Sequence, residues 1–304
     1  MVVSVTPAQY FSRKRGFANG IVYAAGGLGG TIISFALDGL IRRLGTAWTY
    51  RVIGFITLAT GLPSAYLIKE RAPITATPFI DRSLLRDRRF IVLFFAGALA
   101  TFPLFVPPFF LPLYAQSLGL SNSAGAGLVA GFNFSSAVGR LLLGLNADFM
   151  GPLNTLLVSL IVSGISMLVI WPISTSLGPL IAFVIINGIA NGGFFAVMPT
   201  VVGAVFGSRR VSVAMGMIGK TCPLAVSSHV LTYRTTVTGW TGGYLMGAPI
   251  AGFMLAAYGP RHGGPISLNA YHPAIFYAGS MALAASTLVG FVRFNNSISL
   301  KKRI

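Results

Sequence analysis

The sequence predicts an all-α protein with about eight transmembrane helices, and three observations support this fold class. Of 304 residues, 54% are hydrophobic and only 9% are charged, against roughly 25% charged in an average soluble protein. The mean hydropathy of +0.78 is correspondingly high, and so few charges could not cover the surface of a soluble fold. Apolar stretches of the length that crosses a bilayer recur along the chain, separated by short basic clusters.

The apolar stretches are spans because each supplies about 20 residues for a hydrocarbon layer of about 30 Å. Glycines let neighbouring helices pack closely in lipid, and they are frequent in the first stretch. Prolines cluster in the third stretch and predict a break there, of the kind that neighbouring helices can satisfy. In chain order, the expected spans are Phe17–Ile41, Trp48–Ile68, Phe90–Ala115, Ala124–Ala147, Leu153–Ile173, Leu177–Phe206, Val237–Tyr258 and Pro273–Phe294.

The basic residues predict how the spans are oriented. Lys and Arg number 22 against 5 Asp and Glu, a net charge of +17. With the N-terminus inside, fifteen Lys and Arg fall in inner segments and four in outer ones, namely Arg42, Arg43, Arg51 and Arg261. Because cytoplasmic loops carry the excess of basic residues, we expect both termini in the cytoplasm. Whether the protein occupies the plasma membrane or the vacuolar membrane is left open.

Composition and spacing also exclude several classes of protein. A nucleic-acid binder needs exposed basic faces, whereas these basic residues lie between apolar runs. The single cysteine, Cys222, excludes an intrachain disulfide and a cysteine-based metal site. No two acidic residues pair within one span and the histidines lack HExxH spacing, so we expect no enzyme, no metal and no cofactor. Met1–Tyr10 lacks an apolar stretch, so no cleavable signal peptide is expected.

Two motifs resemble a known family. The stretch Tyr10–Gly20 (YFSRKRGFANG), followed by Gly26, Gly27 and Gly30, is similar to the signature that opens helix five in monocarboxylate-transporter-like members of the major facilitator superfamily. The stretch Gly139–Gly144, followed by Ala147, Asp148 and Gly151, resembles the superfamily motif between helices eight and nine. The segments Asn191–Phe195 and Gly239–Gly247 are similar to fungal members of that family.

The resemblance implies a division of the chain. Family members have twelve helices in two halves, and this chain resembles helices five to twelve, so we expect an N-terminally truncated form. Residues 1–68 would be the remnant of the N-terminal half, 69–89 the cytoplasmic central loop, and 90–304 the C-terminal six-helix half. The polar stretch 220–236 interrupts the region that resembles helix eleven. Because Leu231–Arg234 can be encoded by a sequence like an intron branch site and acceptor, we expect a translated intron there; the alternative is a genuine polar loop.

Arg140 is the candidate for contact with a transported solute. It is the basic residue set inside an apolar span, where a charge is costly and usually faces a cavity or a partner. Asn133, Ser136 and Arg140 share one helical face by their spacing, and a guanidinium can hold a carboxylate in two-pronged fashion. The family resemblance implies the same role for an arginine at this point. Animal lactate carriers have an aspartate where this chain has Ser136, so their proton coupling is not implied here. The alternative is that Arg140 extends to the membrane surface.

Four further residues are candidates. Asn187 and Asn191 lie four residues apart on one face, and they would either line the solute path or hydrogen-bond between helices. The resemblance implies that Gly144 and Asp148 hold a cytoplasmic gate, and the alternative for Asp148 is to cap the helix that follows it.

The expected function is transport of a small organic solute, a monocarboxylate or a related anion, across a lipid bilayer by alternating access between two halves. The coupling ion is left open. The alternative is a truncated membrane protein without transport activity, or an incorrect gene model.

Overall fold

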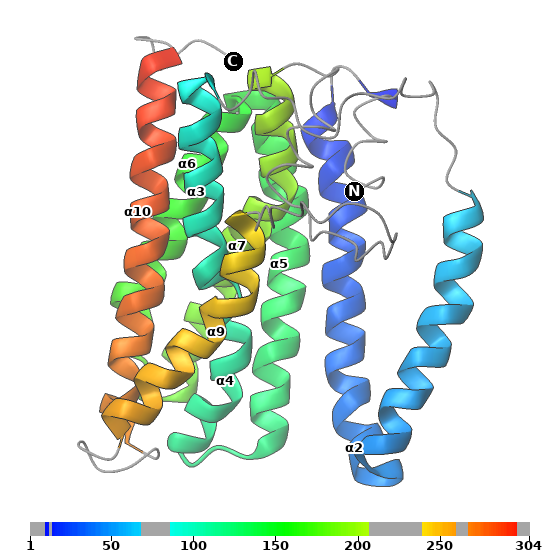
Figure 1. Ribbon diagram of the computed structural model, residues 1–304. Coiled ribbons are helices and arrows are strands. Elements are labelled where there is room, and N and C mark those ends of the chain that lie inside the picture. Colours follow the sequence, from blue (N-terminus) through cyan, green and yellow to red (C-terminus); the bar gives the residue numbers. More distant parts are fainter. Residues whose placement is uncertain (1–9, 12–13, 68–85, 207–238, 260–266, 297–304) are drawn as a thin grey trace, which may run out of the picture.

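The described residues fold into helices, and no strand occurs among them. The computed structural model describes residues 10–11, 14–67, 86–206, 239–259 and 267–296, and the all-α prediction is confirmed. Figure 1 shows the helices side by side along one direction. The elements are α2 (Arg15–Leu67), α3 (Arg88–Leu104), α4 (Val106–Ser117), α5 (Asn122–Met150), α6 (Pro152–Ile165), η2 (Ser166–Ile170), α7 (Leu177–Phe206), α9 (Gly239–Tyr258), η4 (Leu268–Tyr271) and α10 (His272–Asn296).

Six stretches of these helices are long and apolar enough to cross a membrane, and each coincides with a predicted span. They are Arg15–Leu37, Arg88–Ser117, Asn122–Met150, Pro152–Ile170, Leu177–Phe206 and Leu268–Asn295. The other two predicted spans, at 48–68 and 237–258, are helical where the structure describes them, in α2 and α9. Arg51 and several Thr and Ser residues make the first of these less apolar, and five glycines do so in the second. Their crossing of the membrane stays a prediction.

Helix α2 contains a sharp reversal. Gly45 has φ 73° and ψ 168°, a backbone conformation that favours glycine, and it separates a first segment (15–44) from a second segment (46–67). The first segment lies beside α5, and the second runs back along the side of the first segment that faces away from α5 (Figure 1). Most side chains of the second segment are exposed, including Phe55 and Tyr66. Such an apolar exposed face is typical of a helix that faces lipid or further helices.

The other helices begin and end at residues suited to those positions. The Asp87 side chain accepts a hydrogen bond from the Arg89 N–H at the start of α3, and Ser121 accepts one from Ala124 at the start of α5. Helix α5 ends at Gly151, whose φ of 90° is unfavourable for other residues, and Pro152 begins α6. These signals place a tight connection between α5 and α6.

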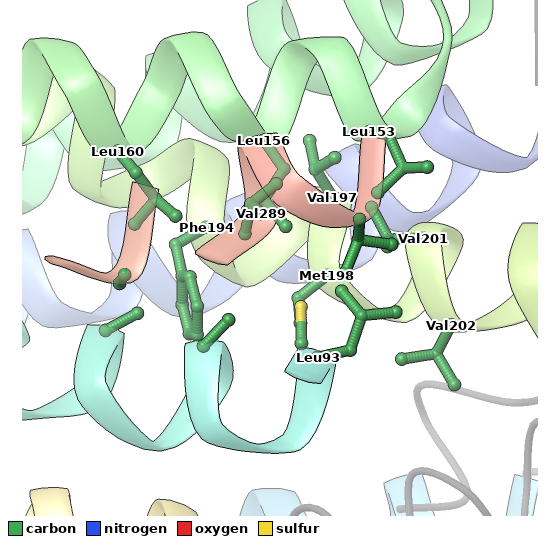
Figure 2. Close-up of a cluster of buried hydrophobic side chains, with 14 of the residues drawn as sticks. Leu93, Leu153, Leu156, Leu160, Phe194, Val197, Met198, Val201, Val202 and Val289 are labelled. Carbon is green, nitrogen blue, oxygen red and sulfur yellow. The ribbon is translucent and has the colours of Figure 1, made fainter. Parts of the chain in front are cut away.

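Two hydrophobic clusters hold the helices together. The larger one joins α3, α5, α6, α7, α9 and α10. Figure 2 shows part of it, where Phe194 and Met198 of α7 lie between Leu93 of α3 and Leu156 of α6. The second cluster lies toward the other end of the helices and includes Trp171, which contacts Phe183 at a ring-centre distance of 4.6 Å. The core of the molecule is therefore the bundle formed by α3 to α10, with α2 attached to it along α5.

Two expectations fall largely outside this description. The predicted central loop at 69–89 is described only from residue 86 onward, and the predicted insert at 220–236 lies outside the described residues altogether.

Candidate functional site

Helix α2 approaches α5 through pairs of small residues. A Cβ atom added to Gly20 would lie 2.5 Å from the backbone oxygen of Arg140, and one added to Gly27 would lie 2.8 Å from the Cβ of Ala137. Gly16 and Gly144 face each other in the same manner at the end of this interface. The absence of side chains brings the two backbones into contact, which is how helices associate where lipid supplies no hydrophobic driving force.

The close approach at Gly16 and Gly144 brings Asp148 to the N-terminus of α2. The Asp148 Oδ1 atom accepts a hydrogen bond from the Gly16 N–H, and Oδ2 accepts one from the Phe17 N–H, each at 2.9 Å. A carboxylate at this position satisfies two of the N–H groups that a helix leaves unpaired, and it interacts favourably with the helix dipole. Asp148 therefore caps α2, whereas α6, the helix that follows it, has no side-chain cap.

Arg140 points from α5 into the region where α2, α7 and α9 meet. Its Nη1 atom donates a hydrogen bond to the carbonyl oxygen of Tyr23 on α2 at 2.5 Å. Its guanidinium carbon lies 4.9 Å from the ring centre of Phe195 on α7. The phenols of Tyr23 and of Tyr244, on α9, interact with it electrostatically. Its Nε atom is buried and has no hydrogen-bond partner among the described residues. The side chain thus contacts neighbouring helices and keeps one N–H available.

Asn133 and Ser136 share the sequence face of Arg140 but have different surroundings. The Asn133 Nδ2 atom donates to the Ser34 hydroxyl on α2 at 3.3 Å, so Asn133 faces α2 as Arg140 does. Ser136 is buried where α5 crosses α7, and its backbone lies against Gly188 and Gly192. Of the predicted stripe, Asn133 and Arg140 therefore meet at the α2 interface, and Ser136 lies at the α7 interface.

Asn187 and Asn191 are fully enclosed and hydrogen-bond to different helices. The Asn187 Nδ2 atom donates to the Ser166 hydroxyl of η2 at 2.8 Å and to the Ser163 carbonyl at 3.3 Å. The Asn191 Nδ2 atom donates to the carbonyl oxygen of Leu104 at 2.9 Å. In this structure both side chains act between helices, which is the second of the two roles expected for them.

The carbonyl that Asn191 binds lacks its usual helical donor because of the predicted break in the third span. Helices α3 and α4 are separated at Phe105, just before Pro107 and Pro108. Proline has no N–H, so Pro108 cannot donate to the carbonyl of Leu104 as a helical residue would. Asn191 supplies the missing donor from α7. The sequence therefore predicts the break, and the structure shows which side chain satisfies it.

Sequence reasoning missed the residues that surround Arg140. Tyr23, Phe195 and Tyr244 lie in apolar spans, where an aromatic side chain carries no signal beyond hydrophobicity. Asn19 was missed as well: it is buried on α2, and its Nδ2 atom donates to the Thr200 hydroxyl on α7 at 3.1 Å. Asn19, Tyr23 and Gly27 follow one another at intervals of four residues, and this spacing is the signal that could have identified the face of α2 that meets α5 and α7.

A bundle of membrane-length helices joined by close glycine contacts and cross-helix hydrogen bonds defines a polytopic integral membrane protein. The sequence profile of the Major Facilitator Superfamily matches residues 2–222. The chain belongs to the Major Facilitator Superfamily, and this confirms the superfamily predicted from its motifs.

Named relatives are fungal transporters. An MFS-type transporter of Aspergillus niger is 30% identical over 254 residues, which cover 82% of this chain and 54% of that protein. The aspyridones efflux protein of Emericella nidulans is 30% identical over 286 residues, 93% of this chain and 54% of that protein. The agnestins efflux protein of Paecilomyces divaricatus is 30% identical over 256 residues, 84% and 55% respectively. The chain spans about half the length of the curated relatives it matches.

These comparisons bear on the expectations unequally. They support the transporter family, a class that is in general not enzymatic. The monocarboxylate-like subtype, the solute, the coupling ion and the side of the membrane on which the termini lie stay predictions.

Proposed function

We propose that the chain acts in the transport of a small organic anion, which Arg140 binds at the meeting point of α2, α5, α7 and α9. The observation that carries this proposal is the environment of the guanidinium. It is held by a backbone carbonyl and an aromatic ring, and its buried Nε–H has no hydrogen-bond partner among the described residues. A carboxylate or enolate on the Nε edge would accept this hydrogen bond. It would also offset the cost of a cation within the membrane, about 2.5–3.5 kcal/mol on insertion scales.

The proposed mechanism is alternating access, in which α2 belongs to one half of the transporter and α3 to α10 belong to the other. Support comes from the nature of the contact between them. The α2 interface is built from glycine contacts and a few hydrogen bonds, including those of Asp148, Asn19 and Asn133. Such an interface can separate without exposing a large hydrophobic core. Gly144 and Asp148 would then form a latch that closes one end of the path.

The names of two relatives suggest the direction of transport. The Emericella nidulans and Paecilomyces divaricatus proteins are named for the efflux of aspyridones and agnestins. We therefore propose that this chain also serves export of an organic compound. Transport is favoured over the alternative of a membrane protein without transport activity, since the matched relatives are named as transporters.

Substrate counterflow in proteoliposomes tests the role of Arg140. With labelled organic acids as substrates, we expect Arg140→Gln to abolish saturable counterflow. Arg140→Lys should weaken it at least about tenfold, because lysine keeps the charge but loses the planar pair of donors. The matched control is Arg51→Gln, which removes an exposed arginine of α2 that lies 5.0 Å from the ring centre of Trp48 on the same helix. Undiminished counterflow by both Arg140 variants, with normal membrane insertion, would remove Arg140 from the mechanism.

A further inference from the structure

Five aromatic side chains form a continuous series of ring contacts beside Arg140, and we call this series the aromatic belt. The ring-centre distances along it are 5.9 Å, 5.6 Å, 6.2 Å and 5.2 Å. The series begins with the ring that lies under the guanidinium, and the belt consists, in order, of Phe195, Phe194, Trp240, Tyr244 and Phe105.

A second residue of the belt, Tyr244, also interacts with Arg140. The Tyr244 phenol interacts electrostatically with Arg140 and with Tyr23 on α2. The belt residues themselves come from α7, α9 and the junction between α3 and α4. Arg140 therefore contacts the first ring of the belt, Phe195, and interacts electrostatically with a later one, Tyr244.

The belt residues differ in how deeply they are buried. Phe194 and Trp240 are buried, with exposed fractions of 2% and 9%. Phe105, Tyr244 and Phe195 are only half-buried, as are Arg140 and Tyr23. Phe195 lies under the guanidinium of Arg140, and the ring contacts of the belt connect it to Tyr244 and Phe105. Arg140 and the belt therefore combine one cation with partly exposed aromatic surface, and no acidic group is among those that act on Arg140 within the described residues.

We propose that the transported anion is an aromatic acid and that Tyr244 is a residue that selects it. This inference rests on the proposed function of Arg140. A small aliphatic acid needs the guanidinium alone and makes no use of the aromatic surface of the belt. An aromatic acid places its carboxylate on Arg140 and its ring against Tyr244, in an offset or edge-to-face arrangement that aromatic rings prefer. Phe105 extends the surface for a larger ring system.

A pair of acids that differ only in aromaticity tests this class. The fluorescence of 2-naphthoate reports its binding to the protein in lipid nanodiscs, and its saturated counterpart, decahydro-2-naphthoate, serves as a competitor of similar size and equal charge. We expect the aromatic acid to bind roughly 2- to 13-fold more tightly, the range that corresponds to one aromatic pair.

Variants of Tyr244 assign the preference to the belt. Tyr244→Leu should reduce the ratio of the two affinities to about one, whereas Tyr244→Phe should retain the preference because it keeps the ring. The matched control is Phe253→Leu, which removes an exposed ring from the same helix and should leave the ratio unchanged.

The outcomes distinguish this inference from the proposed function. Arg140→Gln should weaken both acids equally, since both present a carboxylate. If both acids depend on Arg140 but bind with equal affinity, or if Tyr244→Leu leaves the preference intact, the aromatic class is wrong and the anion site stands. If neither acid binds the unchanged protein, or if Arg140→Gln binds both normally, the proposed function and this inference are both wrong.

Discussion

Asp148 accepts backbone hydrogen bonds from Gly16 and Phe17, residues that lie more than 130 positions earlier in the chain. We expect Asp148→Asn to loosen the attachment of α2 by about 0.5–2 kcal/mol, because the variant loses the charge that favours a helix N-terminus and one of two acceptors. The check is the labelling rate of a cysteine introduced at Ala147, next to Gly16, with a membrane-impermeant maleimide. The rate should rise in the variant.

Asp87 provides the matched control for Asp148. It is also a carboxylate at a helix N-terminus, but it caps its own helix α3 and, among the described residues, joins no distant element. Asp87→Asn should therefore leave the labelling rate at residue 147 unchanged. A rate that rises equally in both variants would show that Asp148 has no particular role between the two helices.

At the scale of elements, the contact between α2 and α5 depends on glycines at particular positions. Gly20→Ala should lower the thermal unfolding temperature in detergent, because its Cβ would lie 2.5 Å from the Arg140 oxygen and force the helices apart. Overpacking of this kind costs about 1–3 kcal/mol. Gly29→Ala is the control: a Cβ there has nothing within 4 Å, so the variant should be neutral or gain up to about 1 kcal/mol of helix propensity. Equal effects of both changes would mean that the glycines act through the helix alone.

The break between α3 and α4 offers a second test at this scale. Asn191→Ala leaves the buried Leu104 carbonyl without its donor and should cost about 1–3 kcal/mol in stability. In a Pro108→Ala background, the new N–H of residue 108 can donate to Leu104, so removal of Asn191 should cost less. The double-mutant cycle measures this difference in the unfolding temperature. A cost that is the same in both backgrounds would show that Asn191 does not substitute for the donor that Pro108 lacks.

The break between α3 and α4 and the two asparagines of α7 show how far the sequence could predict this fold. Apolar length and proline positions predicted the spans and the break, because both follow from the backbone and the bilayer alone. Cross-helix partners do not follow from them. Asn187 and Asn191 are one helical turn apart, yet one meets η2 and the other meets the α3–α4 break.

At the candidate site too, the sequence predicts the position of Arg140 on its helix but not its partners on other helices. Its spacing predicted that it shares a face with Asn133, and the structure places both residues at α2. Its aromatic neighbours come from segments far apart in the chain, and only the angles at which helices pack determine which rings meet the guanidinium.

For the whole molecule, alternating access requires α2 to separate from the bundle at each end in turn. Contacts exist at both ends: Asn19 donates to Thr200 on α7 near the Asp148 end, and Arg42 donates to Ser123 near the start of α5. Cysteines placed at either pair and joined by a short bifunctional maleimide would prevent one of the two separations. We therefore expect each cross-link to abolish counterflow in proteoliposomes, with activity lost in proportion to the fraction cross-linked.

A cross-link inside the bundle provides the control for this prediction. Asn154 on α6 accepts a hydrogen bond from Arg293 on α10 at 2.6 Å, and both residues lie on the same side of the proposed interface. A cysteine pair at these positions should cross-link and leave counterflow largely intact, because α6 and α10 move together. The proposed mechanism would be contradicted by full counterflow after complete cross-linking at either α2 pair, since transport would then proceed without separation of α2 from α5 and α7.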